Sequence, residues 1–338
     1  MMTRTTVLAT LLASALATTA AAEGVVNIYS ARHYDTDENL YGDFEKATGI
    51  TVNRIEGKSD ELIARMTAEG ANSPADILIT TDTSRLTRAK LAGVLQAVDS
   101  DVLEQRIPAA LQDADNTWFG FSQRGRIIFY AKDRVTDVPQ TYLDLADPKY
   151  KDQICIRSST NTYNQTLMAS IVTHHGEEAA KNWADGIVAN MARPPKGGDT
   201  DQLRGLVSGE CDIAVSNTYY FARAIRKNVK GVSESLDQIG WVFPSQDTVG
   251  AHMNLSGGGV AAHAPNRENA IKFLEYLASE SAQKYFSYGN DEYPTVASVE
   301  LADSVKQLGT FKADDVNLSE VAKALPTAQK VFNEAGWK

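Results

Sequence analysis

The chain has 338 residues, of which 43% are hydrophobic and 22% charged, so it is long enough for two domains or one large one. Its 43 acidic residues outnumber its 33 Lys and Arg, and the formal net charge is −10. Such a surface suits neither the phosphates of nucleic acid nor an anionic membrane, and we expect neither as a partner. Its two cysteines are too few for a disulfide scaffold or a four-cysteine zinc site.

The first 22 residues have the pattern of an export signal. One charge, Arg4, precedes an apolar run over 7–16, and small residues follow as far as Ala22. This order predicts a secretory signal peptide over 1–22, because the apolar run is about half of the roughly 20 residues that a membrane anchor needs. We therefore expect the mature chain to be exported to an oxidising compartment.

From residue 25 onward, predicted strands alternate with predicted helices. Apolar runs predict strands over 25–29, 51–55, 75–80, 152–157 and 211–216. Amphipathic segments predict helices over 37–47, 60–69, 86–92, 165–173, 177–189, 201–208 and 266–279. Ser59 is placed to cap the second of these helices. The alternation favours an α/β fold with a mostly parallel sheet, and the absence of repeats or low-complexity linkers favours two lobes within one chain.

Export changes the interpretation of the two cysteines. Cys155 and Cys211 stand 56 positions apart, and in an oxidising compartment such a pair more often forms a disulfide than stays reduced. Two buried thiols are the alternative. A metal site is not expected there, because no nearby Cys or His completes a ligand set.

Two further patterns are interpreted as structural. The glycines of GGG at 257–259 lack the spacing of a dinucleotide fingerprint and predict a close backbone approach or a bend near a hinge. The HHG sequence at 174–176 is interpreted as the surface end of a helix. The chain also contains no G-x-S-x-G or H-E-x-x-H motif, and we expect no enzymatic activity.

The informative residues are tyrosines that follow predicted strands. His33 and Tyr34 come after the first strand, Tyr163 after the strand at 152–157, and Tyr219 and Tyr220 after the strand at 211–216. In open α/β sheets, ligands bind at the carboxyl ends of the strands. A single tyrosine at such a place is more often a core residue, but three groups at equivalent positions indicate a site.

The expected chemistry of this site is that of phenolates. Tyr219 and Tyr220 fall in the first turn of a predicted helix, where Ser216 or Asn217 could cap and the positive helix end favours an ionised phenol. Arg223 follows on the same side of that helix. Phenolate oxygen is a hard donor, so the pattern predicts a site for a hard, highly charged cation.

With these residues in place, the sequence resembles the periplasmic ferric iron-binding proteins of ABC transporters, in the branch with one His and four Tyr ligands. Three stretches carry the resemblance: YSARHY at 29–34, STNTYNQ at 159–165 and NTYY at 217–220. It extends over about 24–338. The ligands that the resemblance implies are His33, Tyr34, Tyr163, Tyr219 and Tyr220. It also implies that Arg124 and Arg223 support the ligands from behind.

The resemblance further implies a type II periplasmic binding protein fold, with mixed sheets flanked by helices and crossing strands between two lobes. The first lobe is expected to comprise 24–122 and 247–297, and the second 123–246 and 298–338. The implied function is capture of Fe³⁺ between the lobes, in the periplasm, and delivery to an inner-membrane ABC permease and its ATPase. We expect the binding protein to be a monomer.

Other readings of the sequence remain open. A ferrous carrier would use the same residues. A protein of the same fold for an organic or oxyanion ligand, such as a polyamine or phosphonate, predicts carboxylates or Ser, Thr and backbone donors instead of four phenols. An exported hydrolase requires a nucleophile and a base, and no such set is found.

Overall fold

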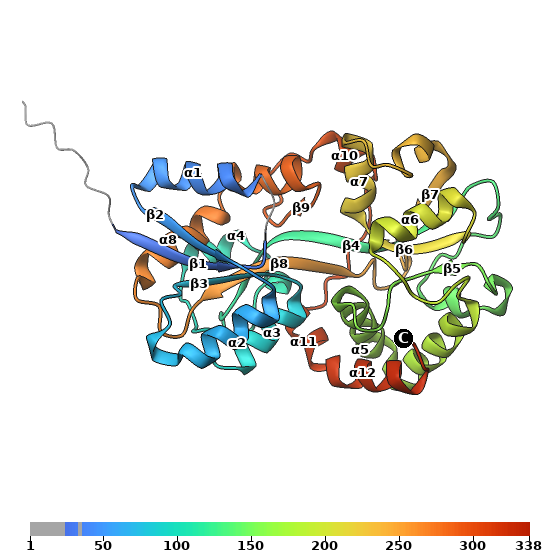
Figure 1. Ribbon diagram of the computed structural model, residues 1–338, viewed down its shortest axis with the longest axis horizontal. Coiled ribbons are helices and arrows are strands. Elements are labelled where there is room, and N and C mark those ends of the chain that lie inside the picture. The colour runs from blue at the N-terminus through green and yellow to red at the C-terminus, as the bar shows by residue number, and fades with distance from the viewer. Residues whose placement is uncertain (1–23, 33–35) are drawn as a thin grey trace, which may run out of the picture.

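The computed structural model describes residues 24–32 and 36–338, which form two lobes that lie side by side (Figure 1). The signal peptide predicted over 1–22 lies outside the described residues, and so do the candidate ligands His33 and Tyr34. Arg32 and Thr36, which stand on either side of that segment in the sequence, are described.

The described strands form one mixed sheet of the order β2-β1-β3-β8-β4-β6-β5, and two further strands, β7 and β9, also pair with β4. Their bounds are β1 Val25–Ser30, β2 Thr51–Glu56, β3 Ile77–Thr81, β4 Phe119–Ala131, β5 Ile154–Cys155, β6 Ile213–Asn217, β7 Ile239–Val242, β8 Met253–Val260 and β9 Tyr293–Pro294. The ladders β1–β2, β1–β3 and β5–β6 are parallel, whereas β8 and β4 pair antiparallel with all their neighbours. The expectation of a mostly parallel sheet is therefore wrong, because the two long central strands, β4 and β8, run antiparallel to the strands beside them.

Strand β4 belongs to both lobes. Its first half, up to Gly125, pairs with β8 in the first lobe, and its second half, from Arg126, pairs with β6 and β7 in the second. Figure 1 shows β4 and β8 running from one lobe into the other. Arg124 and Arg126 thus stand at the point where the chain passes between the lobes.

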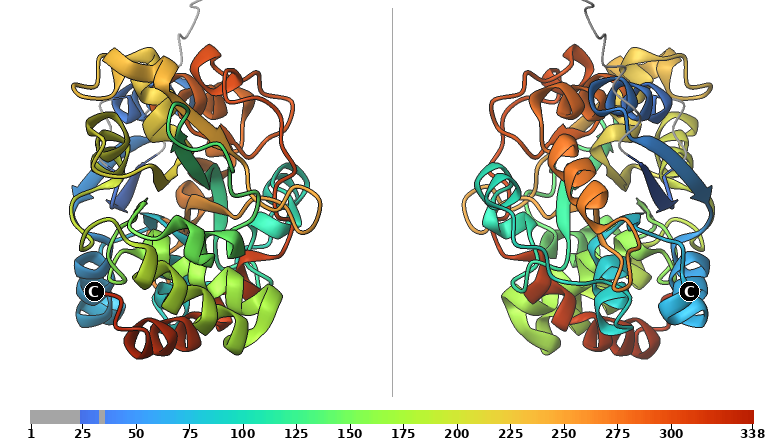
Figure 2. Two further views of the ribbon diagram at one scale, coloured as in Figure 1. Left: turned by 90° about the vertical axis from the view of Figure 1, so that its right-hand side faces the viewer. Right: turned by 90° about the vertical axis from the view of Figure 1, so that its left-hand side faces the viewer.

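Helices cover both faces of the sheet. They are α1 Asp37–Thr48, α2 Ser59–Glu69, α3 Thr83–Leu91, α4 Asp101–Arg106, α5 Thr162–Asn190, α6 Asp199–Ser208, α7 Thr218–Arg226, α8 Arg267–Leu277, α9 Glu280–Lys284, α10 Asp303–Lys306, α11 Leu318–Lys323 and α12 Leu325–Glu334. In the second lobe, α6 and α7 lie on one side of the strands and α5 and α12 on the other (Figures 1 and 2). The predicted helices that begin at 37, 60, 86, 201 and 266 all form. The first begins where it is predicted to, and the starts of the others are shifted by one to three residues.

Local details differ from the sequence predictions where distant residues intervene. The side chain of Ser59 does not cap α2. Its hydroxyl instead bonds Thr80 at 2.5 Å, because the helix packs against β3. The strand expected over 152–157 shortens to two residues. The helices expected over 165–173 and 177–189 form one run that breaks at Gly176, whose φ of 82° and ψ of 170° are not helical. The predicted helix end after His174 and His175 is thereby confirmed.

Two other sequence predictions are confirmed by the packing. Cys155 and Cys211 form a disulfide in the second lobe, and Gly205 of α6 packs directly on it: a Cβ atom there would come within 2.7 Å of the Cys211 sulfur. In β8, a Cβ atom on Gly257 would come within 2.4 Å of the Phe119 carbonyl oxygen. The glycines of β8 therefore allow the close backbone approach that their sequence predicts.

Within the described ranges, no helix combines the length and the apolar character that crossing a membrane requires.

Candidate metal centre

Three of the candidate tyrosines meet at the starts of two helices. Tyr163 lies in the first turn of α5, and Tyr219 and Tyr220 lie in the first turn of α7. The hydroxyl oxygens of Tyr163 and Tyr219 are 3.3 Å apart, and the ring centroids of Tyr219 and Tyr220 are 4.2 Å apart. The structure thus brings together residues that are separated by 56 positions in the sequence. Two phenol hydroxyls and a third tyrosine ring are therefore in contact at two helix N-termini.

The two helices begin here for local reasons that differ. The Asn161 side chain caps α5 by accepting a hydrogen bond from the backbone N–H of Asn164. Helix α7 is anchored instead by Thr218, whose hydroxyl accepts from the backbone N–H of Gly125 at 3.2 Å. The expected side-chain cap from Ser216 or Asn217 is not formed. The side-chain amide oxygen of Asn217 accepts a hydrogen bond from Arg126, and the Ser216 hydroxyl donates to the backbone carbonyl oxygen of Asn217.

Arg126 is the centre of a buried network beneath the tyrosines. Its guanidinium donates to the Asp199 carboxylate at 2.8 Å, to Asn217 at 3.0 Å and to Asn164 at 2.7 Å. Those three residues stand at the starts of α6, α7 and α5, so one side chain ties all three helix starts to β4. Arg126 and Asp199 are at most 1% exposed. We call this set of Arg126, Asp199, Asn164, Asn217 and Arg157 the lobe anchor.

Arg157 completes the lobe anchor on the other carboxylate oxygen of Asp199, at 2.7 Å. Burial opposes ionisation of Asp199, yet Arg126 and Arg157 outweigh it and hold the pKa of this carboxyl below its ordinary value. Burial likewise opposes the charge of Arg157, but Asp199 raises its pKa, with smaller contributions from Tyr220 and Tyr163. Both groups are therefore ionised at neutral pH. Asp199 carries one negative charge between the two guanidinium groups of Arg126 and Arg157, so the three side chains together leave one positive charge beside the phenols.

Guanidinium groups surround the three tyrosine rings. The Arg124 and Arg157 guanidinium carbons lie 5.7 and 5.6 Å from the centroid of Tyr163. Arg223 lies 5.4 Å from the centroid of Tyr219 and 5.8 Å from that of Tyr220. Nearby cations favour the ionised form of a phenol, so this environment suits phenolates.

The sequence prediction named Tyr163, Tyr219, Tyr220, Arg124 and Arg223, which the structure brings close together, but it did not name the lobe anchor. One signal was available. Arg124 and Arg126 alternate on a strand and must project to the same face, so an arginine beside the site at 124 implies a second at 126. Asp199 and Arg157 have no such local signal. Across the described ranges, no group of three or more His, Cys, Asp or Glu is arranged to hold a metal ion.

A hollow of about 580 Å³ opens at the carboxyl ends of β1 and β3. Ser30 and Ala31 line it from the end of β1, just before the segment that contains His33 and Tyr34, and Thr81 lines it from the end of β3. Strand ends are the expected place for a ligand in an α/β sheet.

Comparison with known proteins places the chain in a family. A model of bacterial extracellular solute-binding proteins matches residues 39–313. The chain is 48% identical to iron uptake protein A1 of Synechocystis sp., over 93% of this chain and 87% of that protein. A solved Trichodesmium protein (IdiA, FutA), in complex with iron and citrate ligands, is 50% identical, with a TM-score of 0.90 over 93% of this chain and 100% of that one.

A ferric binding protein from Campylobacter jejuni is also similar, at 43% identity and a TM-score of 0.87, over 93% of this chain and 100% of the solved one. These likenesses confirm the predicted α/β fold with two lobes, which is that of the type II periplasmic binding proteins. The similar proteins are binding components of transport systems and not enzymes. The chain therefore belongs to the family of bacterial extracellular solute-binding proteins.

Proposed function

We propose that this protein captures ferric iron in the periplasm and delivers it to an inner-membrane ABC permease and its ATPase. The observation that carries the proposal is the contact between three phenols at two helix starts, enclosed by arginines. The relatives support the choice of metal, because they are named for iron uptake or ferric binding at 43–50% identity. Tyr163, Tyr219 and Tyr220 are the proposed ligands from the second lobe, and His33 and Tyr34 those from the first.

The domain division follows the same proposal. The first lobe comprises 24–122 and 247–297, and the second comprises 123–246 and 298–338. The change of partner along β4 at Gly125 and Arg126 supports a boundary close to residue 123. The packing of α12 against α5 supports placing the C-terminal segment with the second lobe. Ligands from both lobes give the closed arrangement a complete coordination shell, so iron binding favours closure.

Charge favours the ferric ion over the ferrous ion. Four phenolates and a neutral imidazole leave one negative charge around Fe³⁺ and two around Fe²⁺. The arginines around the tyrosines offset the single negative charge of the Fe³⁺ site more completely than the two negative charges of the Fe²⁺ site. Uncompensated charge is costly in a partly buried site. Reduction is therefore a route to release. Acid is a second route, because protons compete with the metal for every ligand.

The test is an absorption spectrum of the mature protein with Fe³⁺, followed by competition titrations against a chelator for each oxidation state. We expect a coloured iron–phenolate band and a preference for Fe³⁺. Tyr220→Phe removes one phenolate, and its ferric affinity should fall by more than the roughly 10- to 100-fold that loss of an outer partner of a ligand costs. His33→Ala should do less, because water can replace a neutral donor.

Tyr276→Phe is the matched control. It removes a phenol hydroxyl that donates to the Leu40 carbonyl oxygen in the first lobe, away from the three tyrosines. This variant should keep the affinity and the colour of the wild type. Equal or tighter binding of Fe²⁺ by the wild type contradicts the ferric assignment, and an unchanged Tyr220→Phe protein contradicts the ligand assignment.

A further inference from the structure

Two adjacent carboxylates stand between the arginines that flank the tyrosines. Asp291 and Glu292 follow a π-helical turn, Tyr285–Gly289, and directly precede β9. They are 0% and 1% exposed. Neither the sequence prediction nor the proposed ligand set uses them. Buried carboxylates of this kind need cations, and each of these two binds arginines from a different part of the chain.

Glu292 binds arginines on the side of the first lobe. Its carboxylate lies 3.4 Å from the Nη1 atom of Arg32 and 3.5 Å from that of Arg124, and it accepts a hydrogen bond of 2.5 Å from Ser122. Arg32 directly precedes the segment with His33 and Tyr34. Arg124 lies over the ring of Tyr163. Glu292 therefore contacts the neighbours of ligands from both lobes.

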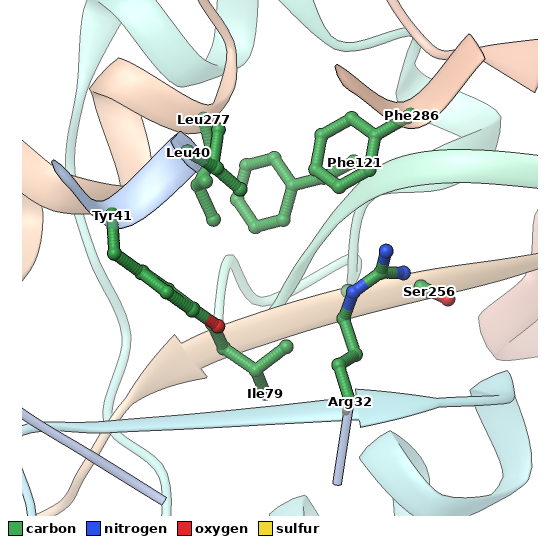
Figure 3. Close-up of a pocket in the computed structure, with 9 residues that line it drawn as sticks. Arg32, Leu40, Tyr41, Ile79, Phe121, Ser256, Leu277 and Phe286 are labelled. Carbon is green, nitrogen blue, oxygen red and sulfur yellow. The ribbon is translucent and has the colours of Figure 1, made fainter. Parts of the chain in front are cut away.

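The Glu292 carboxylate matters for the orientation of Arg32, because Arg32 has mostly apolar surroundings. Figure 3 shows the Arg32 guanidinium at the edge of a cavity lined mostly by apolar side chains, among them Phe121 and Phe286. The guanidinium carbon lies 5.0 Å from the centroid of Phe286. In so apolar a place, carboxylate partners orient the guanidinium, and Glu292 and Asp37 are two of them among the described residues.

Asp291 binds the helix that carries two of the tyrosines. Its two carboxylate oxygens accept hydrogen bonds of 2.7 and 2.6 Å from Arg226, in a bidentate pair, and one of them lies 4.0 Å from the Nε atom of Arg223. Both arginines belong to α7, which begins with Tyr219 and Tyr220 in its first turn. Asp291 itself has a φ of 63°, in the left-handed region, and Ser304 also donates to its carboxylate at 2.8 Å.

We propose that Asp291 and Glu292 are a positioning pair that couples the two halves of the iron site. This inference rests on the proposed function and adds two residues that lie outside the proposed ligand set. Asp291 and Glu292 are consecutive residues. A displacement of α7 therefore moves Asp291, and with it Glu292 and the guanidinium groups of Arg32 and Arg124 that Glu292 binds. The pair thereby fixes the position of α7, with its phenols, relative to Arg32 and Arg124, and it holds the cations that offset the charge of the iron–phenolate group.

The experiment compares two isosteric variants, Asp291→Asn and Glu292→Gln, with the control Asp113→Asn. Asp113 is also a buried carboxylate with a cationic partner, Lys90 at 2.8 Å, and its other described side-chain partners are the hydroxyls of Thr117 and Ser319, not an arginine beside the tyrosines. All three variants should lower stability. Only the first two should weaken ferric binding, by roughly 10- to 100-fold, and shift the iron–phenolate absorption band.

A measurement on the metal-free protein separates positioning from a loss of iron chemistry. In Asp291→Asn, the backbone amides in the first turn of α7 should exchange hydrogen faster than in the wild type, whereas in Asp113→Asn they should not. If Asp291→Asn does not fold, Arg226→Lys replaces it in the experiment. This variant keeps the positive charge but removes the bidentate pair, so we expect smaller changes of the same kind in ferric affinity, absorption band and amide exchange.

The outcomes are distinct. A wild type without a ferric band overturns the proposed function itself. A wild type that binds Fe³⁺, together with variants whose affinity, band and α7 exchange all match those of Asp113→Asn, overturns the positioning pair and leaves only a structural role.

Discussion

Two buried groups of charges flank the tyrosine cluster, and they differ in what they join. The lobe anchor around Arg126 and Asp199 connects β4 to the starts of α5, α6 and α7, all in the second lobe. The positioning pair connects two parts of the chain that are far apart in the sequence. Asp291 binds Arg226 of α7, and Glu292 binds Arg32, which follows the first strand 260 positions earlier.

The two groups of charges therefore have different structural roles. The lobe anchor holds three phenols together within one folded unit, so that part of the site is preorganised before metal arrives. The positioning pair depends on how α7 and the segment after β1 stand relative to each other. The first group therefore sets the shape of half the site, and the second relates that half to the other.

The largest expected effect comes from removing the centre of the lobe anchor. Arg126→Met leaves Asp199 with Arg157 as its described cationic partner and takes hydrogen-bond donors from Asn164 and Asn217. Breaking a buried ion pair in this way should lower the free energy of unfolding by about 3–5 kcal/mol. Urea unfolding monitored by fluorescence measures the loss, and ferric titration should show weaker binding.

Arg134→Met is the control for this variant. Its pair with Asp212 is a 2.6 Å contact in the same lobe, but both side chains are about 30% exposed. Such partly exposed pairs contribute about 0.2–1 kcal/mol, so stability and ferric affinity should change little. If Arg126→Met binds iron as tightly as Arg134→Met does, the lobe anchor does not preorganise the tyrosines.

The disulfide provides the next effect in size. Cys155 and Cys211 close a loop with a sequence separation of 56, which contains α5 and α6. In the chain-entropy model, the double variant Cys155→Ala/Cys211→Ala should lose about 4 kcal/mol. Ferric affinity should remain close to that of the wild type, because the lobe anchor still ties the helix starts together. Thiol labelling of the denatured, unreduced wild type should find no free thiol, and two free thiols would refute the bond.

The smallest expected effect is a dependence of stability on pH that comes from His252. This residue precedes β8, is fully buried according to its 2% exposure, and neither ring nitrogen meets a hydrogen-bond partner in the described part of the chain. Burial, with smaller contributions from Arg126 and His174, lowers the pKa of His252 to about 3. The folded protein therefore keeps the ring neutral while the unfolded chain takes up a proton below about pH 6.5.

Because the unfolded state binds more protons, stability falls as the pH drops from about 6.5 towards 3. The contribution of His252 at pH 5 should be a loss of about 2 kcal/mol relative to pH 7. His252→Leu removes this contribution, so its unfolding free energy should vary less between pH 7 and pH 5. Parallel curves for wild type and variant would show that His252 does not titrate on unfolding.

The sequence predicted the elements that have a strong local signal. The amphipathic helices begin within a few residues of their expected starts. Their apolar side chains recur with the helical period, and that pattern can be recognised in the sequence without knowing what the helix packs against. Strands β4 and β8 had no comparable signal. Arg124 and Arg126 interrupt the apolar pattern of β4 yet are buried, and β8 contains three glycines in place of side chains that favour strands.

The candidate site divides in the same way. The sequence by itself placed Tyr163, Tyr219 and Tyr220 after strands and at helix starts, and it paired the two cysteines, because both inferences need only short-range pattern and compartment. Only the tertiary structure decided which charges surround the phenols. Asp199 meets Arg126 across 73 positions and Asp291 meets Arg226 across 65, and such contacts follow from how the strands and helices pack, not from any local pattern.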